Sequence, residues 1–550
     1  MNNLNILFWN SNGIKRKTNE LQALVSSLKI DIILLSETRI SPSTILKIPN
    51  FHTYREDIPP KRGSPPHGGT ALLVHRRIVH QPIKLATTLQ STSVKIKIDN
   101  IEILITSVYK PPRITLTPGD LDILTKSAEW FIAAGDFNAK HPLWYSRVAN
   151  QAGMVLNNHV SQNDYHVTAP DTPTHFPVSP FYKPDVLDIA LIKIPQLIHT
   201  TNLCELSSDH NPVLLNISSS PIRSAPPSQG KRVNWLKFTR SLKEAKINPN
   251  PPIKNTSEID KEINVFTTTV KSAIEASAYP TNQKPNRNSL PPEIVREIQT
   301  KNRLRRAWQQ NRDPILKRRL NAQTTFVKNI LITHKQDEWD MFVDSLDTKD
   351  GSIFKLNKTL LNKRPAIHPL IGPNGLVFSA NEKAELHADS LENQFTPNQG
   401  PEIAEVTETV NKIKSTNISQ SNLCTTPGNV KLLIKKLPKK KAPGADNITN
   451  TALKFLPENS LLSLTKILNA CLRFCYFPLA WKKAKIISIP KPGKDPKIPE
   501  SYRPIALLSS ISKLYERIIL DKLHTHSAGK YETNNSHFVQ DTPRLCNWST

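Results

Sequence analysis

An acid and an amide lie two residues apart at the end of an apolar run. The run Trp130–Ala134 is followed by Gly135, Asp136 and Asn138, which is the pattern of a strand that ends in a tight turn. In extended chain the two polar side chains point to the same side, and Gly135 permits close approach to the backbone. A carboxylate can take a proton from water while a neutral amide orients that water, which suits phosphodiester hydrolysis. By itself the pattern is equally typical of an Asx-rich turn.

Further polar side chains occur at or near the ends of other expected strands. In chain order they are Asn10, Asn12, Glu37, Tyr109, Asp188, Asp209 and His210. Each has an ordinary structural interpretation, as a turn former, a helix start or cap, or a half-buried aromatic or histidine. Together they supply acids for a hard cation and neutral donors for a phosphate. The sequence therefore predicts that these residues share one site at a common sheet end.

The segments that must position these residues are mostly strands. Residues 18–28 have the pattern of an amphipathic helix between two strands, which implies a parallel strand pair. Many strands and few helices over residues 1–217 predict an α/β fold of two packed sheets with helices outside. The expected strands are residues 4–9, 31–36, 69–74, 93–98, 101–109, 130–136, 187–192 and 212–217, with a hairpin turn at 99–100.

The chain is strongly basic, and its excess charge is concentrated after residue 220. Among 550 residues, 73 are Lys or Arg and 46 are Asp or Glu, and only +4 of the net +27 belongs to residues 1–220. Such an excess favours a polyanionic partner, nucleic acid before acidic lipid. We find no signal peptide or membrane-spanning run, and the five scattered cysteines fit a reducing compartment.

The sequence changes character twice after residue 217. Residues 218–290 are rich in Pro and Ser and predict a linker with only short helices. Residues 291–425 predict a basic helical connecting region, in which Arg303 and Arg306 are interleaved with aromatic residues. RNA binding and a solvated helix face are equally good interpretations of this pattern.

Six short motifs follow one another along residues 9–210. They are Trp9-Asn10-x-Asn12-Gly13, Ser36-Glu37-Thr38, Val108-Tyr109, Gly135-Asp136-Phe137-Asn138-Ala139, Leu187-Asp188 and Ser208-Asp209-His210. In this order they resemble the endonuclease/exonuclease/phosphatase superfamily, and specifically the apurinic-type endonuclease domain of Jockey-like non-LTR retrotransposon polyproteins. The resemblance implies a four-layered α/β sandwich, with two packed mixed sheets flanked by helices.

The resemblance also implies a metal site and a set of catalytic roles. Glu37 is then the principal Mg²⁺ ligand, with Mn²⁺ as an alternative ion, and Asp209 and Asn12 lie nearby. Many repair members of the superfamily have Asp where this chain has Asn12, which keeps an oxygen ligand but removes a charge. Among the catalytic residues implied, Asp136 activates water and Asn138 orients it. His210, oriented by Asp188, contacts the scissile phosphate, which Asn10 and Tyr109 also help to hold.

A loop before Asp188 resembles a DNA-contacting loop of the same family. It contains Thr174 and His175, and a loop-surface role for the histidine is an equally good interpretation. Asp185 is expected to fall outside the following strand and to be solvated.

Residues 426–550 resemble the fingers of a non-LTR reverse transcriptase. Lys485, Lys491 and Arg503 lie where that resemblance places a grip on template or nucleotide phosphates. A polymerase palm needs two adjacent aspartates for its metals, and the sequence contains no Asp-Asp dipeptide. We therefore interpret this part as the truncated N-terminal part of a reverse transcriptase domain without polymerase activity. Apolar helix faces are then expected to lack packing partners, at Ile511, Leu514, Ile518 and Leu523.

These observations predict a Mg²⁺-dependent DNA endonuclease that nicks target DNA for target-primed reverse transcription. The expected partners are target DNA and element RNA, with no membrane, and the expected location is the nucleus after cytoplasmic synthesis. Two alternatives remain open at this point. One is a catalytically silent nucleic-acid-binding remnant, and the other is a phosphoesterase of the same superfamily that acts on lipids or small molecules.

Overall fold

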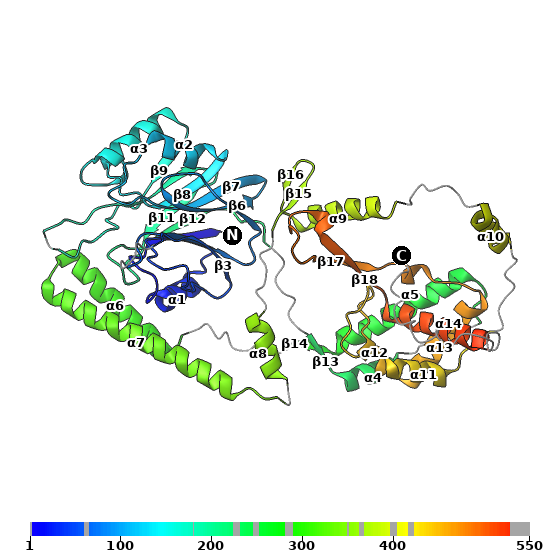
Figure 1. Ribbon diagram of the computed structural model, residues 1–550. Coiled ribbons are helices and arrows are strands. Elements are labelled where there is room, and N and C mark those ends of the chain that lie inside the picture. The colour runs from blue at the N-terminus through cyan, green and yellow to red at the C-terminus, as the bar shows by residue number, and fades with distance from the viewer. Residues whose placement is uncertain are drawn as a thin grey trace. The chain divides into compact units, whose positions relative to one another are not determined.

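The computed structural model describes residues 3–59, 65–179, 181–223, 231–245, 252–280, 290–348, 351–361, 368–396, 404–415 and 423–528. The chain divides into two compact units, each described here by itself (Figure 1). The first comprises residues 1–227, 284–390 and 496–499, and the second comprises residues 228–283, 391–495 and 500–550. Residues 529–550, the end of the predicted reverse transcriptase part, lie outside the described residues.

The first unit is built around two six-stranded sheets. Their strand orders are β11-β12-β1-β2-β4-β3 and β5-β6-β7-β8-β10-β9, and each contains one parallel pair, β1-β2 or β7-β8, among antiparallel pairs. The first sheet consists of β1 (Leu4–Asn10), β2 (Ile32–Ser36), β3 (Phe51–Glu56), β4 (Thr70–His75), β11 (Ile198–Asn202) and β12 (Val213–Ile217). The second consists of β5 (His80–Ile83), β6 (Gln90–Ile98), β7 (Ile101–Tyr109), β8 (Trp130–Asp136), β9 (His166–Thr168) and β10 (Asp188–Lys193).

Alternation along the strands places one hydrophobic core between the sheets and one outside each of them. In β1, Ile6 and Phe8 face the inner core, whereas Leu7 packs outward with Leu21 of α1 (Thr18–Leu28). The helices α2 (Pro118–Lys126) and α3 (Gln151–Gln162) cover the outer face of the second sheet, where Leu121 and Leu156 join the third core. The four layers confirm the predicted α/β sandwich.

Two long helices pack against this sandwich within the same unit. They are α6 (Pro292–Asn311) and α7 (Pro314–Asp344), and α7 lies beside α1 (Figure 1). Trp308 of α6 and Leu320 of α7 form a small buried cluster with Phe176 of the sandwich. The other described elements of this region are the one-turn helix at Pro142–Trp144, α8 (Ser352–Leu361), β15 (Leu370–Gly372), β16 (Gly375–Val377) and α9 (Ala380–Gln394).

The second unit is mainly helical. Its elements are β13 (Lys231–Val233), α4 (Trp235–Glu244), α5 (Thr256–Ser277), β14 (Ala278–Pro280), α10 (Ala404–Ser415), α11 (Pro427–Lys436), α12 (Asn450–Lys454), α13 (Glu458–Arg473), β17 (Lys485–Pro490), β18 (Tyr502–Leu507) and α14 (Ser510–Ala528), with one-turn helices at Leu479–Trp481 and Pro499–Ser501. None of the described helices has the length and apolarity to cross a membrane.

Two expectations for this part of the chain are wrong. The interval 218–290 was expected to hold only short helices, but α5 has 22 residues. Its buried Ile263, Phe266 and Val270 recur at helical spacing and join the core of α11, α13 and α14. Neighbouring Pro and Asn runs concealed this amphipathic pattern.

The apolar face of α14 also has packing partners. Ile511, Leu514 and Ile518 are at most 2% exposed, in the same core as α5 and α13, and only Leu523 is exposed as expected. The segment that had been assigned to a linker therefore shares one hydrophobic core with the fingers region.

Candidate active site

The predicted catalytic residues meet where strand ends of the two sheets come together. Asn10 ends β1 in the first sheet, and Tyr109 and Asp136 end β7 and β8 in the second. Asp188 begins β10, where it is the cross-strand partner of Asp136, and Tyr109 is the partner of Asp136 in the parallel pair. Sheet register therefore brings residues 109, 136 and 188 side by side.

Asp136 is held in a buried, hydrogen-bonded position. Its Oδ2 accepts from Asn10 Nδ2 over 2.8 Å, and its Oδ1 accepts from the backbone N–H of Asn138 over 3.0 Å. The bond from Asn10 joins the two sheets at the site. Asp136 is 2% exposed, and this burial raises the pKa of its carboxyl group to about 7, although the charge of His210 acts in the opposite direction. Such a carboxylate can both hold and release a proton near neutral pH.

His210 forms a buried pair with Asp188. Its Nδ1 lies 2.7 Å from Asp188 Oδ2. Burial by itself would lower the pKa of His210, but the charge of Asp188, the hydrogen bond to it and the charges of Asp136 and Asp209 together outweigh burial and raise the pKa to about 9. The imidazole is therefore a cation at neutral pH. Because Nδ1 is engaged with Asp188, Nε2 is the nitrogen that can donate to a substrate.

Asp209 lies between two donors from different parts of the chain. Asn12 Nδ2 donates to its Oδ1 over 2.9 Å, and His175 Nε2 lies 3.7 Å from its Oδ2. Burial would raise the pKa of Asp209, but the nearby His175 and His210 imidazoles and the hydrogen bond from Asn12 hold it far below its usual value. The His175 and His210 rings lie 4.5 Å apart between centroids. Within the described part of the chain, ligand atoms of His175, Asp209 and His210 all lie within 4.8 Å of one another.

Glu37 is bound by a tyrosine and an arginine. Tyr109 Oη donates to Glu37 Oε1 over 2.5 Å, and Arg39 forms an ion pair with Glu37 Oε2. Burial and the bond to Glu37 raise the pKa of Tyr109 far above its usual value, so its hydroxyl group stays protonated. Glu37 has a φ of +48°, a conformation that is strained for a non-glycine residue and concentrates at functional sites.

Of the other predicted residues of this region, Asn138 lies at the site, whereas Thr174 is buried away from it. Asn138 lies beside Asp136 and donates from Nδ2 to the carbonyl of Lys110 over 3.0 Å. Thr174 is fully buried, and its hydroxyl accepts from the backbone N–H groups of Leu187 and Asp188. The prediction that Thr174 contacts nucleic acid is therefore wrong, because its side chain instead fixes the start of β10.

Asp185 also lies elsewhere than expected. It is 2% exposed, it pairs with Lys140 over 3.0 Å, and it accepts from the backbone N–H of Arg147 over 3.0 Å. The expectation that it is solvated is wrong. The backbones of Asp185 and His175 exchange two N–H···O=C hydrogen bonds. This bridge holds His175 where its ring lies near Asp209.

The predicted nucleic-acid-binding residues fall into both units. Arg303 and Arg306 are exposed on α6, close in sequence to the helix face that packs on the sandwich. Lys485 and Arg503 are exposed on the β17-β18 hairpin of the second unit, and Lys491 is half-buried just after β17. Arg305, by contrast, is buried against the loop that carries His210, and the sequence did not single it out for this role.

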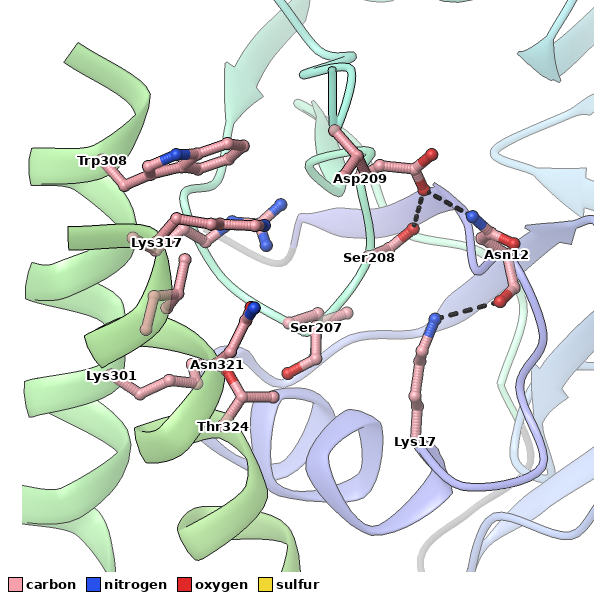
Figure 2. A pocket seen from close by; sticks show the side chains of 14 residues that line it. Asn12, Lys17, Ser207, Ser208, Asp209, Lys301, Trp308, Lys317, Asn321 and Thr324 are labelled. Atoms are coloured by element: carbon pink, nitrogen blue, oxygen red, sulfur yellow. Dashed lines mark hydrogen bonds between the residues drawn. The ribbon is translucent and has the colours of Figure 1, made fainter. Parts of the chain in front are cut away.

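A pocket opens between α6, α7 and the loops that carry Asn12 and Asp209. It has a volume of about 220 Å³, and its lining includes Lys17, Lys317 and Asn321 (Figure 2). Figure 2 shows Asp209 at its rim, with Asn12 and Ser208 bonded to the carboxylate. The catalytic cluster is therefore continuous with a pocket that is lined by three lysines, Lys17, Lys301 and Lys317.

Comparison with known proteins adds an independent finding. Residues 103–214 match a family model described as endonuclease-reverse transcriptase. The probable RNA-directed DNA polymerase from transposon BS of Drosophila melanogaster is 32% identical over 540 residues, which cover 95% of this chain and 59% of that protein. The RNA-directed DNA polymerase from mobile element jockey of Drosophila funebris is 30% identical, over 95% of this chain and 58% of its own length. The chain is a homologue of jockey-type non-LTR retrotransposon proteins.

The chain spans just under three fifths of the length of these curated relatives. Among solved structures, the endonuclease domain of TRAS1, a telomere-specific non-LTR retrotransposon, is similar, with 18% identity and a TM-score of 0.33 over 39% of this chain and 98% of that one. The sequence matches to transposon BS and jockey cover 95% of this chain and so run through both units.

Proposed function

We propose that the first unit is a DNA endonuclease, which hydrolyses phosphodiester bonds at the site of Asp136 and His210. The observation that carries the proposal is the pairing of a buried carboxylate, bonded to Asn10, with a buried imidazole bonded to Asp188. Asp136 accepts a proton from the attacking water, and Asn138 orients that water. His210 donates from Nε2 to a phosphate oxygen and stabilises the charge that develops there.

The donor set also fits a divalent cation, Mg²⁺ with Mn²⁺ as the alternative. Glu37, Asp209 and Asn12 offer the oxygen ligands that these hard ions prefer. The buried Oδ1 of Asp188 has no hydrogen-bond partner among the described residues, so the site holds an unsatisfied acceptor. When bound, the ion would supply charge stabilisation to the phosphate and the leaving oxygen. Arg39, whose side chain is 45% exposed, now neutralises Glu37 and can move into solvent.

A nucleic acid fits the surroundings better than a lipid or a small phosphate ester. Lys17 and Lys317 line the pocket beside Asp209, and Arg303 and Arg306 are exposed on the adjacent helix. Cations distributed in this way suit the repeated phosphates of a nucleic acid strand.

In the setting of a jockey-type element, the nick would leave a 3′-hydroxyl that primes reverse transcription in the nucleus, with element RNA as a second partner. The proposal is confined to hydrolysis, since residues 1–550 contain no Asp-Asp dipeptide. Lys485, Lys491 and Arg503 remain proposed contacts to nucleic acid.

Nicking of supercoiled plasmid by the full chain tests the proposal. We expect Mg²⁺-dependent conversion to open circles, and a fall in rate of about 100-fold or more in Asp136→Asn or His210→Ala. Asp164→Asn is the matched control for the carboxylate, because the Asp164 side chain is 95% exposed. Salt-sensitive DNA binding without nicking would instead favour the silent remnant. Preferential hydrolysis of a phospholipid, with no competition by duplex DNA, would favour the other phosphoesterase.

A further inference from the structure

One face of α6 is buried against the catalytic region of the sandwich. Lys301, Arg305 and Gln309 recur at intervals of four and therefore lie along one side of the helix. Lys301 pairs with Glu20 of α1, and Gln309 Nε2 donates to Asn211 Oδ1 over 2.7 Å. This face is polar, so its burial is specified by hydrogen bonds rather than by apolar area alone.

Arg305 makes the central contacts of that face. Its guanidinium donates to Asn211 Oδ1 from Nε over 3.1 Å and from Nη2 over 2.7 Å, and Nη2 also reaches the carbonyl of His210 over 3.3 Å. The same carbonyl accepts from Trp9 Nε1 over 3.2 Å. Two donors from distant parts of the chain therefore grip the backbone of His210.

The loop held in this way carries the residues that act on the phosphate. Asn211 follows His210, is itself fully buried, and donates its backbone N–H to Thr174 over 2.7 Å. The backbone carbonyl of Asp209 accepts from Phe176 over 2.8 Å. Movement of residues 209–211 would therefore shift the His210 ring relative to Asp188 and Asp209 relative to His175.

Burying the charged side chain of Arg305 costs free energy that some other interaction must offset. Arg305 is 5% exposed, and it forms no salt bridge among the described residues. Lys301, one turn earlier, does form one, with Glu20. A buried charge without a counterion is unfavourable, and neutral residues could pack two helices against a sandwich at less cost. What Arg305 offers that they do not is a rigid fork of donors that fits the Asn211 amide oxygen and the His210 carbonyl.

We propose that Arg305 is a positioning residue of the nuclease, and that α6 thereby completes an active site whose other parts all come from residues 1–217. This inference rests on the proposed function. It also implies that the working nuclease extends beyond the sandwich, because residues 209–211 are fixed partly from the connecting helices.

The test uses the full chain with Arg305→Ala and Arg305→Lys. We expect kcat for plasmid nicking to fall by about 10- to 100-fold in Arg305→Ala with KM nearly unchanged, since the loss is of geometry rather than of DNA binding. Arg305→Lys keeps the charge but loses the fork, and it should fall between the wild type and Arg305→Ala. Arg319→Ala removes an exposed arginine from α7 and should leave both parameters unchanged.

Rescue of the nicking rate by added guanidinium ion would distinguish a positioning role of Arg305 from a purely structural one. At millimolar concentration the ion should restore part of the rate of Arg305→Ala, whereas equal sodium chloride should not. A rise in KM that accounts for the whole loss, or no loss in a folded Arg305→Ala protein, would overturn the proposal. If Arg305→Ala does not fold, Arg305→Lys decides by the same criteria.

Hydrogen exchange separates this inference from the proposed function. Amides of residues 208–211 should exchange faster in Arg305→Ala than in wild type, while those of β1 and β8 should not change. Unchanged exchange at 208–211 would sink the positioning role, whatever the nicking assay gives. Absence of nicking by the wild-type chain would sink the endonuclease proposal and leave the exchange result to be judged by itself.

Discussion

At the scale of single residues, the site depends on surroundings that raise the pKa values of Asp136 and His210. Burial raises the pKa of Asp136 to about 7, whereas at His210 the neighbouring carboxylates, chiefly Asp188, together outweigh burial and raise the pKa to about 9. A base and an acid of this kind coexist in their working forms between those two values. Neither could be assigned from residue type, because both depend on what is packed around the side chain.

The nicking rate should therefore depend on pH in a bell shape. It should rise as pH passes about 7, where Asp136 loses its proton, and fall as pH passes about 9, where His210 loses its own. Asp188→Asn removes a charge that raises the pKa of both His210 and Asp136, so it should move the descending limb to lower pH and shift the ascending limb as well. Single-turnover nicking from pH 5.5 to 10 measures both limbs, and a descending limb that is identical in Asp188→Asn would contradict this assignment.

At the scale of elements, the end of β8 leaves no room for a Cβ at Gly135, which lies between the backbone of β7 in the same sheet and a side chain of β2 in the other. A Cβ on Gly135 would lie 2.0 Å from the Val108 carbonyl oxygen and 3.0 Å from Ser36 Oγ, and the residue has a φ of +151°. Ser36 Oγ donates to that same carbonyl over 3.0 Å and so ties the sheets together beside Asp136. Only glycine leaves room for this contact.

Gly135→Ala should therefore destabilise the first unit. We expect a loss of about 2 to 4 kcal/mol in the free energy of unfolding, from the steric conflict and the backbone conformation together. Gly119→Ala in α2 is the matched control, because its nearest contact is Thr117 Oγ1 at 3.8 Å, and it should be neutral or stabilising. Urea unfolding followed by tryptophan fluorescence measures both, and equal midpoints for the two variants would show that a side chain is tolerated at residue 135.

At the scale of the whole molecule, the two units have separate hydrophobic cores. That of the second unit combines α4 and α5 with α11, α13 and α14, and Phe266 of α5 is 3% exposed within it. The proposed catalytic residues all belong to the first unit. Stability of the second core and nicking should therefore be separable properties.

Phe266→Ala should destabilise the second unit and spare nicking. Removal of a buried phenylalanine costs about 3 to 5 kcal/mol, so amides of α13 and α14 should lose protection from hydrogen exchange. The neighbouring Val265 is 52% exposed, and Val265→Ala should change neither property. A fall in nicking rate that parallels the lost protection in Phe266→Ala would show that the two units do not act separately.

The sequence by itself determined the two-sheet fold of residues 1–217 and the set of polar residues at its sheet ends. It could do so because strand periodicity, strand-end position and motif order are local properties of the chain. Asn10, Asp136 and Asp188 could be named in this way before their mutual contacts were known.

Burial and long-range pairing could be learned from the tertiary structure alone, because local sequence patterns do not encode them. The structure showed that Thr174 is buried and that His175 reaches Asp209. It placed α5 in a core that its flanking Pro runs had concealed. It also showed that Arg305 is buried and donates a hydrogen bond to the backbone carbonyl of His210, 95 residues away in sequence. The many basic residues around Arg305 gave no sign of this contact.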